Sequence, residues 1–212
     1  MPGYSLRCYK DHMNKKTLKI TRGSLIAAIF GVLLFLNRQT MNIAEEFLVY
    51  AYPLPIMIFT AAYGLLSALP VFAVMIMLSF LMVTPYSALY ALCYAAVGLA
   101  YGFCLHRKAS SRVTTVFVLA ATVLTNIAEL LLISRLTGIR LDEEIISYRE
   151  MLNQTFSAFP MAIPEYMLSD GYLKRMLIFS VTIFGVLQGF IIRLCGKLVY
   201  KRFRFRENLY QG

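Results

Sequence analysis

Acidic residues, histidine and cysteine are scarce in this chain of 212 residues, and tryptophan is absent. The sequence contains 11 Asp and Glu, 2 His and 4 Cys, and charged residues amount to only 15% of it. An average soluble domain carries about 25% charged residues. Hydrophobic residues make up 59%, which is more than a soluble domain usually contains. The composition therefore excludes an ordinary soluble protein and favours a membrane protein.

The sequence also lacks the motifs of metal sites and of common enzymes. The four cysteines, Cys8, Cys93, Cys104 and Cys195, are far apart and form neither a disulfide framework nor a CxxC site. There is no HExxH, no GxSxG and no Gly-rich phosphate loop. We therefore expect no metal, no other cofactor and no enzymatic activity. An intramembrane enzyme acting on lipid is the least favoured class, because no nucleophile and base are paired by spacing.

Six apolar runs are long enough to cross the hydrocarbon core of a bilayer, which takes about 20 helical residues. They cover residues 20–36, 47–66, 69–83, 85–105, 113–134 and 173–198. Pro70 and Pro85 suit the first turns of the third and fourth helices. The predicted fold is thus an all-α membrane protein, with a six-helix transmembrane bundle over residues 20–198.

Positive charge is distributed unevenly among the segments that connect these runs. If both termini are cytoplasmic, 15 Lys and Arg lie inside, whereas six lie outside together with eight acidic residues. This distribution satisfies the positive-inside rule and explains the basic excess, so we expect a multi-pass protein of the bacterial cytoplasmic membrane and no nucleic-acid partner. Residues 1–19 are then a basic leader and residues 199–206 a basic tail. The last six residues, 207–212, resemble a protease-tag remnant with one aromatic missing.

The segment from 135 to 172 is the only long connection. Apolar residues recur in it at helical spacing, behind three acidic residues that suit a helix N-terminus. The apolar residues are Leu141, Ile145, Tyr148, Leu152 and Phe159. The pattern predicts an amphipathic helix in the outer loop between the fifth and sixth membrane helices.

The fifth membrane helix carries the most costly polar group, Glu129, with Asn126 three residues before it on the same face. An acid within a span indicates a functional site, and its position in the outer half predicts a pocket open to the outside. The alternative is an internal ion pair with Arg135 or Arg175. Tyr52, near two prolines at the start of the second helix, suits the rim of such a pocket. The candidate ligand-binding residues are Asn126, Glu129, Tyr52, Arg135 and Tyr166.

The first membrane helix carries small residues four positions apart, at Gly23, Ala27 and Gly31. Small residues at this spacing allow another helix to approach closely in lipid. They indicate either a docking face for a separate membrane protein or internal packing of the bundle.

Two segments resemble a known family. The entry to the first helix, Thr21-Arg22-Gly23-Ser24-Leu25-Ile26-Ala27-Ala28, and the start of the second, Tyr52-Pro53-Leu54-Pro55-Ile56, are similar to the substrate-binding S components of energy-coupling factor transporters. Within that group the chain most resembles the YybS-like predicted membrane proteins. The resemblance covers residues 18–112, and beyond them only the topology is similar.

This resemblance implies a concrete function. S components capture a vitamin or similar micronutrient outside the cell and dock through the first helix onto a coupling transmembrane subunit that carries two ATPases. Ala27 and Gly31 would occupy the AxxxA docking site of the family, and Asn126 and Glu129 would lie where ligand contacts are expected. The long outer loop departs from compact S components.

The alternative is a function without transport. Scaffold proteins of the MreD type have a similar size and helix number, and they bind other envelope proteins. A scaffold has little need of an acid in an outward pocket, so the importer subunit is the favoured prediction.

Overall fold

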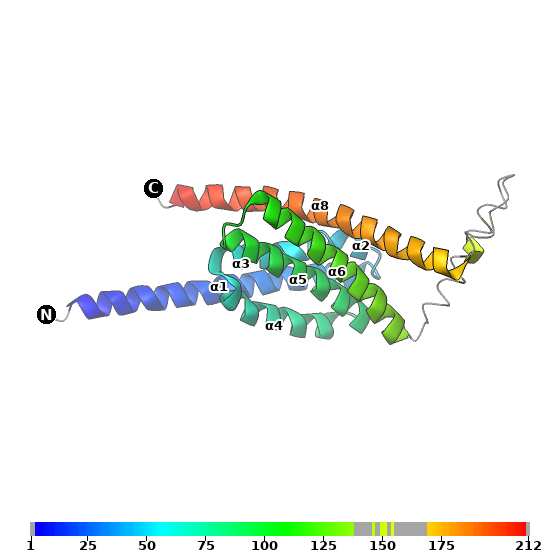
Figure 1. The fold of residues 1–212 in the computed structure, drawn as a ribbon. Coiled ribbons are helices and arrows are strands. Elements are labelled where there is room, and N and C mark those ends of the chain that lie inside the picture. The colour runs from blue at the N-terminus through cyan, green and yellow to red at the C-terminus, as the bar shows by residue number, and fades with distance from the viewer. Residues whose placement is uncertain (1–2, 138–145, 147–148, 152–153, 155–168, 211–212) are drawn as a thin grey trace. The chain divides into compact units, whose positions relative to one another are not determined.

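The computed structural model describes residues 3–137, 146, 149–151, 154 and 169–210. The elements formed by these residues are all helices, and no strand occurs among them (Figure 1). They are α1 (Gly3–Gln39), α2 (Glu45–Leu48), α3 (Pro53–Tyr63), α4 (Leu65–Met82), α5 (Pro85–His106), α6 (Ser111–Thr137) and α8 (Asp170–Tyr210).

Six stretches of the described chain are helical, long and apolar enough to cross a membrane, which confirms the predicted number of spans. They are Lys16–Gln39, Glu45–Tyr63, Leu65–Met82, Pro85–His106, Ser111–Leu132 and Asp170–Arg202. The amphipathic helix predicted for the long connection falls mostly on residues outside the described ranges.

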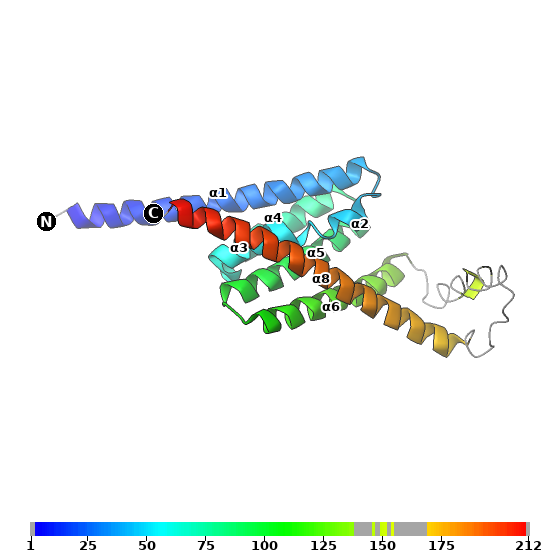
Figure 2. The same ribbon diagram turned by 90° about the horizontal axis from the view of Figure 1, so that it is seen from above.

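The chain divides into two compact units, one of residues 1–118 and 190–212 and the other of residues 119–189. In the first unit α3 packs most extensively against α5, while α4 contacts α1, α3 and α5. Helices α1 and α4 lie side by side in both views (Figures 1 and 2). The last part of α8 also belongs to this unit. There, Tyr101 of α5 donates a hydrogen bond to the Arg193 carbonyl at 3.2 Å.

The contact between α3 and α5 depends on two glycines of α5 spaced four residues apart. A Cβ atom at Gly98 would lie 2.2 Å from the carbonyl oxygen of Pro53. One at Gly102 would lie 2.6 Å from the carbonyl oxygen of Met57. Only hydrogen fits in this space, so the two backbones touch at a GxxxG motif, as in many membrane helix pairs.

The second predicted helix is broken, and the third begins earlier than expected. Helix α2 ends at Leu48 and α3 begins at Pro53, which occupies the first-turn position that proline favours. The start predicted at residue 69 is wrong, because α4 begins at Leu65 and contains Pro70 in its interior. The boundary is set by Gly64, whose positive φ of 82° interrupts the helix. Membrane helices tolerate an interior proline.

Tyrosines of α5 form the aromatic packing stripe that their spacing indicates. The rings of Tyr86 and Tyr90 stack with their centres 6.4 Å apart, and those of Tyr90 and Tyr94 lie 5.1 Å apart. Tyr90 and Tyr94 are buried. The stripe therefore contributes to the core of the first unit.

Candidate functional site

A buried carboxyl group lies where α1, α2 and α5 meet. Glu45, the first residue of α2, is only 8% exposed. Its Oε1 accepts a hydrogen bond from Asn37 Nδ2 and its Oε2 accepts one from Ser87 Oγ, both at 3.4 Å. These distances exceed the usual range for such bonds. We name Asn37, Glu45, Ser87 and the nearby Tyr52 the Glu45 cluster.

No cationic side chain of the described residues forms an ion pair with Glu45. The nearby cation Arg38 instead donates to the Met82 carbonyl at 3.3 Å. A buried carboxyl without an opposite charge is unfavourable by several kcal/mol if it ionises. Glu45 thus has two weak neutral donors and no protein counter-charge.

Two further polar atoms of the cluster lack partners. Asn37 Oδ1 and the Tyr52 hydroxyl are buried, and neither makes a hydrogen bond to any described residue. Both side chains are 0% exposed. Burial without a partner costs about 1–3 kcal/mol for each group. Such groups are rare in native proteins and call for an explanation.

The backbone that places these residues is unusual at the end of α1. Met41 and Asn42 have φ values of 51° and 66°, in the left-handed region. Asn tolerates this conformation better than Met, so the turn carries strain. The turn is closed by a hydrogen bond from the Asn42 N–H to the Asn37 carbonyl at 3.0 Å. It reverses the chain so that Glu45 meets Asn37, eight residues earlier.

A cleft of about 430 Å³ adjoins the cluster. It is lined by Arg38, Met41, Asn42, Leu81, Met82, Val83 and Thr84. Two lining residues also hold the cluster in place. The Asn42 carbonyl accepts the Glu45 N–H at 3.2 Å, and Thr84 Oγ1 accepts the Ser87 N–H at 3.4 Å. The cleft therefore shares its walls with the residues that hold Glu45 and Ser87 in place.

The second unit contains the predicted pair of Asn126 and Glu129 on α6. Asn126 Nδ2 donates to Gln188 Oε1 and to the Thr122 carbonyl, both at 2.9 Å. These bonds use both N–H donors of Asn126. Gln188 thus forms an interhelical hydrogen bond with Asn126. Glu129 is partly buried one turn further along α6.

Two glycines of α8, four residues apart, bring α8 close to α6 in this unit. A Cβ atom at Gly189 would lie 2.4 Å from Thr122 Oγ1. One at Gly185 would lie 3.1 Å from the Cα of Val123. This second GxxxG motif was not singled out from the sequence, although its spacing is visible there.

The interhelical pair in the second unit makes a testable contribution to stability. We expect Asn126→Leu and Gln188→Leu to show a coupling free energy of about 0.6 kcal/mol, the average for hydrogen bonds between membrane helices. A double-mutant cycle of unfolding in mixed micelles measures it. Gln188→Leu paired with the exposed Leu187→Ala serves as a control and should be additive. Additivity of the first pair would contradict the bond.

The remaining predicted ligand residues are dispersed. Arg135 is exposed on α6, Tyr52 belongs to the first unit, and Tyr166 lies outside the described residues. A ligand site made of all five residues stays a prediction. The grouping of Glu45, Asn37 and Ser87 was not predicted, because the sequence indicated only that Glu45 is one of the acidic residues of the outer segments.

The predicted docking residues of α1 face the inside of the first unit. Gly23, Ala27 and Gly31 are all buried. A Cβ atom at Gly23 would lie 2.8 Å from Val71 Cγ2 of α4. One at Gly31 would make ordinary contacts with Met82 Sδ at 3.8 Å and Leu78 Cδ1 at 3.9 Å. In this arrangement the small residues serve internal packing, and docking of a partner on them stays a prediction.

The six apolar helices define an all-helical, multi-pass membrane protein. Among the described residues, no three His, Cys, Asp or Glu side chains are grouped so as to hold a metal ion. Residues 28–211 match the family described as predicted membrane protein (DUF2232), and the chain belongs to that family. No curated protein and no solved structure matches it.

Proposed function

We propose that this chain is the substrate-binding subunit of an energy-coupling-factor-type importer and that the Glu45 cluster binds its small-molecule substrate. The importer class comes from the resemblance of residues 18–112 to S components. The binding role of the cluster is supported by one observation above all, a buried carboxyl group without a cationic partner in the described chain. Polar groups at such a cost within a membrane protein mark functional sites.

The chemistry of the cluster limits the substrate. The Glu45 carboxylate and Asn37 Oδ1 accept hydrogen bonds, and the Tyr52 hydroxyl accepts or donates one. These groups together suit a protonated amine, or another group rich in N–H donors. The substrate class is therefore a small cationic or N–H-donating molecule, which agrees with a vitamin-like micronutrient.

The position of the cluster suits capture from outside. It lies at the end of α1 opposite to the basic residues Lys16 and Lys19, and the positive-inside rule places those residues in the cytoplasm. The cluster would then face the external side, next to the cleft lined by Arg38 and Thr84. Energy for release inward would come from a coupling transmembrane subunit with two ATPases.

Gentle purification of the full chain from native membranes tests this function. We expect mass spectrometry to find an ATPase pair and a coupling subunit among the co-purifying proteins. We also expect a cationic or amine-containing small molecule to be released on denaturation. Recovery of cell-shape or envelope-synthesis proteins, with neither ATPase nor bound metabolite, would instead support the scaffold of the MreD type.

A further inference from the structure

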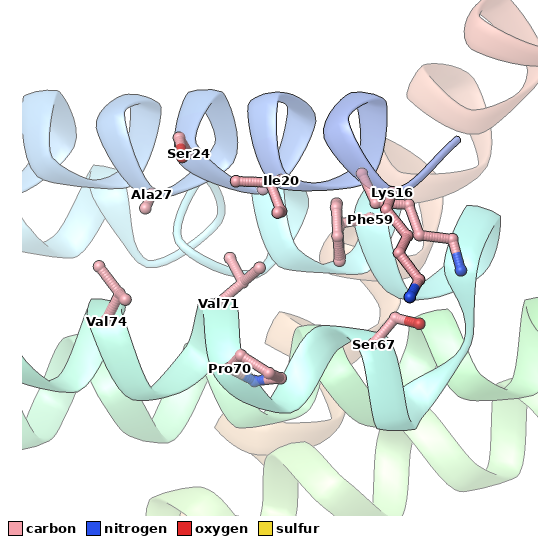
Figure 3. Close-up of a pocket in the computed structure, with 11 residues that line it drawn as sticks. Lys16, Ile20, Ser24, Ala27, Phe59, Ser67, Pro70, Val71 and Val74 are labelled. Atoms are coloured by element: carbon pink, nitrogen blue, oxygen red, sulfur yellow. The ribbon is translucent and has the colours of Figure 1, made fainter. Parts of the chain in front are cut away.

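We propose that the groove between α1 and α4 binds one anionic phospholipid, with its phosphate at Lys16 and Lys19 and an acyl chain along the helices. The groove has a volume of about 420 Å³ and lies wholly within the first unit. Figure 3 shows Lys16 and Ser67 at one end of it and Ala27 and Val74 at the other. The two lysines at one end and the apolar side chains along the rest of the groove indicate the chemistry of the occupant.

None of the described residues that line the groove is acidic. The nearest acid in the sequence is Asp11, five residues before Lys16. Lys16 and Lys19 are exposed on α1. The sequence contains no Asp or Glu from residue 12 to 44 or from 47 to 128. Glu45 and Glu46 follow the opposite end of α1, about 32 Å away at 1.5 Å per residue. The lining of the groove therefore supplies no acidic group to these lysines, and an anion from outside the chain can bind them.

Contacts with Tyr63 hold Lys19 at the mouth of the groove and Arg22 near it. Lys19 Nζ lies 5.6 Å from the centre of the Tyr63 ring. Arg22 Nη1 donates to the hydroxyl of the same tyrosine at 2.7 Å. The cations are thus oriented beside the groove, where lysines near a membrane surface attract anionic lipid headgroups.

The rest of the groove is mostly apolar. Ile20, Phe59, Pro70, Val71 and Val74 line it, with Ser24 and Ser67 as the hydroxyl groups. From Lys16 to Ala27 it follows α1 for about 16 Å. An apolar groove of this length, with cations at one end, suits an extended acyl chain whose headgroup lies at the lysines.

Retention of lipid by the purified full-length protein tests the proposal. The protein is placed in nanodiscs of phosphatidylcholine with a minor fraction of phosphatidylglycerol, re-extracted and analysed by native mass spectrometry. We expect phosphatidylglycerol to be retained in preference to phosphatidylcholine. Lys16→Gln with Lys19→Gln should lower this preference about thirtyfold, since each lysine near the surface contributes about a factor of five. The matched control, Lys197→Gln with Lys201→Gln on α8, should leave it unchanged.

A second pair of variants tests the path of the acyl chain. Val74→Trp fills the groove and should abolish retention of the bound lipid, whereas Met77→Trp, on the exposed surface of α4 outside the groove, should not. Equal retention of both lipids by the wild type would overturn the proposal. An equal loss in the Lys197 and Lys201 control would do so too, as would full retention of the lipid by Val74→Trp.

Discussion

Replacing Gly98 by leucine should prevent the first unit from folding. The Cβ atom alone would lie 2.2 Å from the Pro53 carbonyl oxygen and 2.7 Å from the Pro53 Cα. These are backbone atoms, which no side-chain rotation moves away. Overpacking in a core usually costs about 1–3 kcal/mol, and a backbone collision lies at or beyond the upper end of that range. We expect Gly98→Leu to reduce folded protein in the membrane at least tenfold, as measured by size-exclusion chromatography in mild detergent.

A matched glycine on another helix of the same unit controls this experiment. Gly31→Ala brings a Cβ atom no closer than 3.8 Å to Met82 Sδ, an ordinary contact. We expect this variant to be expressed and folded like the wild type. If Gly98→Leu is as stable as Gly31→Ala, α3 and α5 do not pack as described.

The helices of this protein were predictable because their cause is local. A bilayer requires about 20 apolar residues for each span, and these residues follow one another in the sequence, where they are directly visible. The boundaries were less predictable, since Gly64 and Pro70 are both plausible interruptions. Only the backbone conformation shows that Gly64 ends α3, through its positive φ.

Helix pairing was much less predictable. Small residues at four-residue spacing occur at Gly23 and Ala27, at Gly98 and Gly102, and at Gly185 and Gly189. The spacing shows that another helix can approach closely, but it does not indicate which helix this is. The first of these motifs was predicted as a docking or packing face, whereas the closest backbone contact occurs at the second.

The Glu45 cluster could not be predicted from patterns in the sequence. Glu45 and Glu46 are adjacent and have the same chemistry, yet one is buried and the other exposed. The difference arises from the left-handed turn at Met41 and Asn42 and from the hydrogen bond that Ser87 of α5 donates to Glu45. Both are tertiary features. Tyr52 was predicted as a ligand residue from its place near the start of the second helix, and it belongs to this cluster.

Conservative variants of the cluster should separate stability from binding. Tyr52→Phe removes a buried hydroxyl that has no partner in the described chain. We expect it to raise the free energy of unfolding by about 1 kcal/mol in the ligand-free protein. If the hydroxyl contacts the substrate, the same variant retains less of it after purification. Opposite effects on stability and binding are typical of a group kept for function.

Glu45→Gln should have the largest effect on binding. The substitution keeps the shape of the side chain but removes the charge that a cationic substrate requires. Truncating one partner of a buried charge pair costs about 2–5 kcal/mol, equivalent to at least about thirtyfold in affinity. We therefore expect the small molecule released from the wild type to be nearly absent from Glu45→Gln, as measured by mass spectrometry for equal amounts of folded protein.

The neighbouring acid provides a stringent control for this substitution. Glu46→Gln changes the net charge identically on an exposed side chain one residue away, so it should retain the molecule at the wild-type level. Two equal losses would show that general electrostatics, rather than the cluster, attracts the substrate. Full retention in Glu45→Gln would make Glu45 a structural residue and would return the search for the substrate site to Asn126 and Glu129.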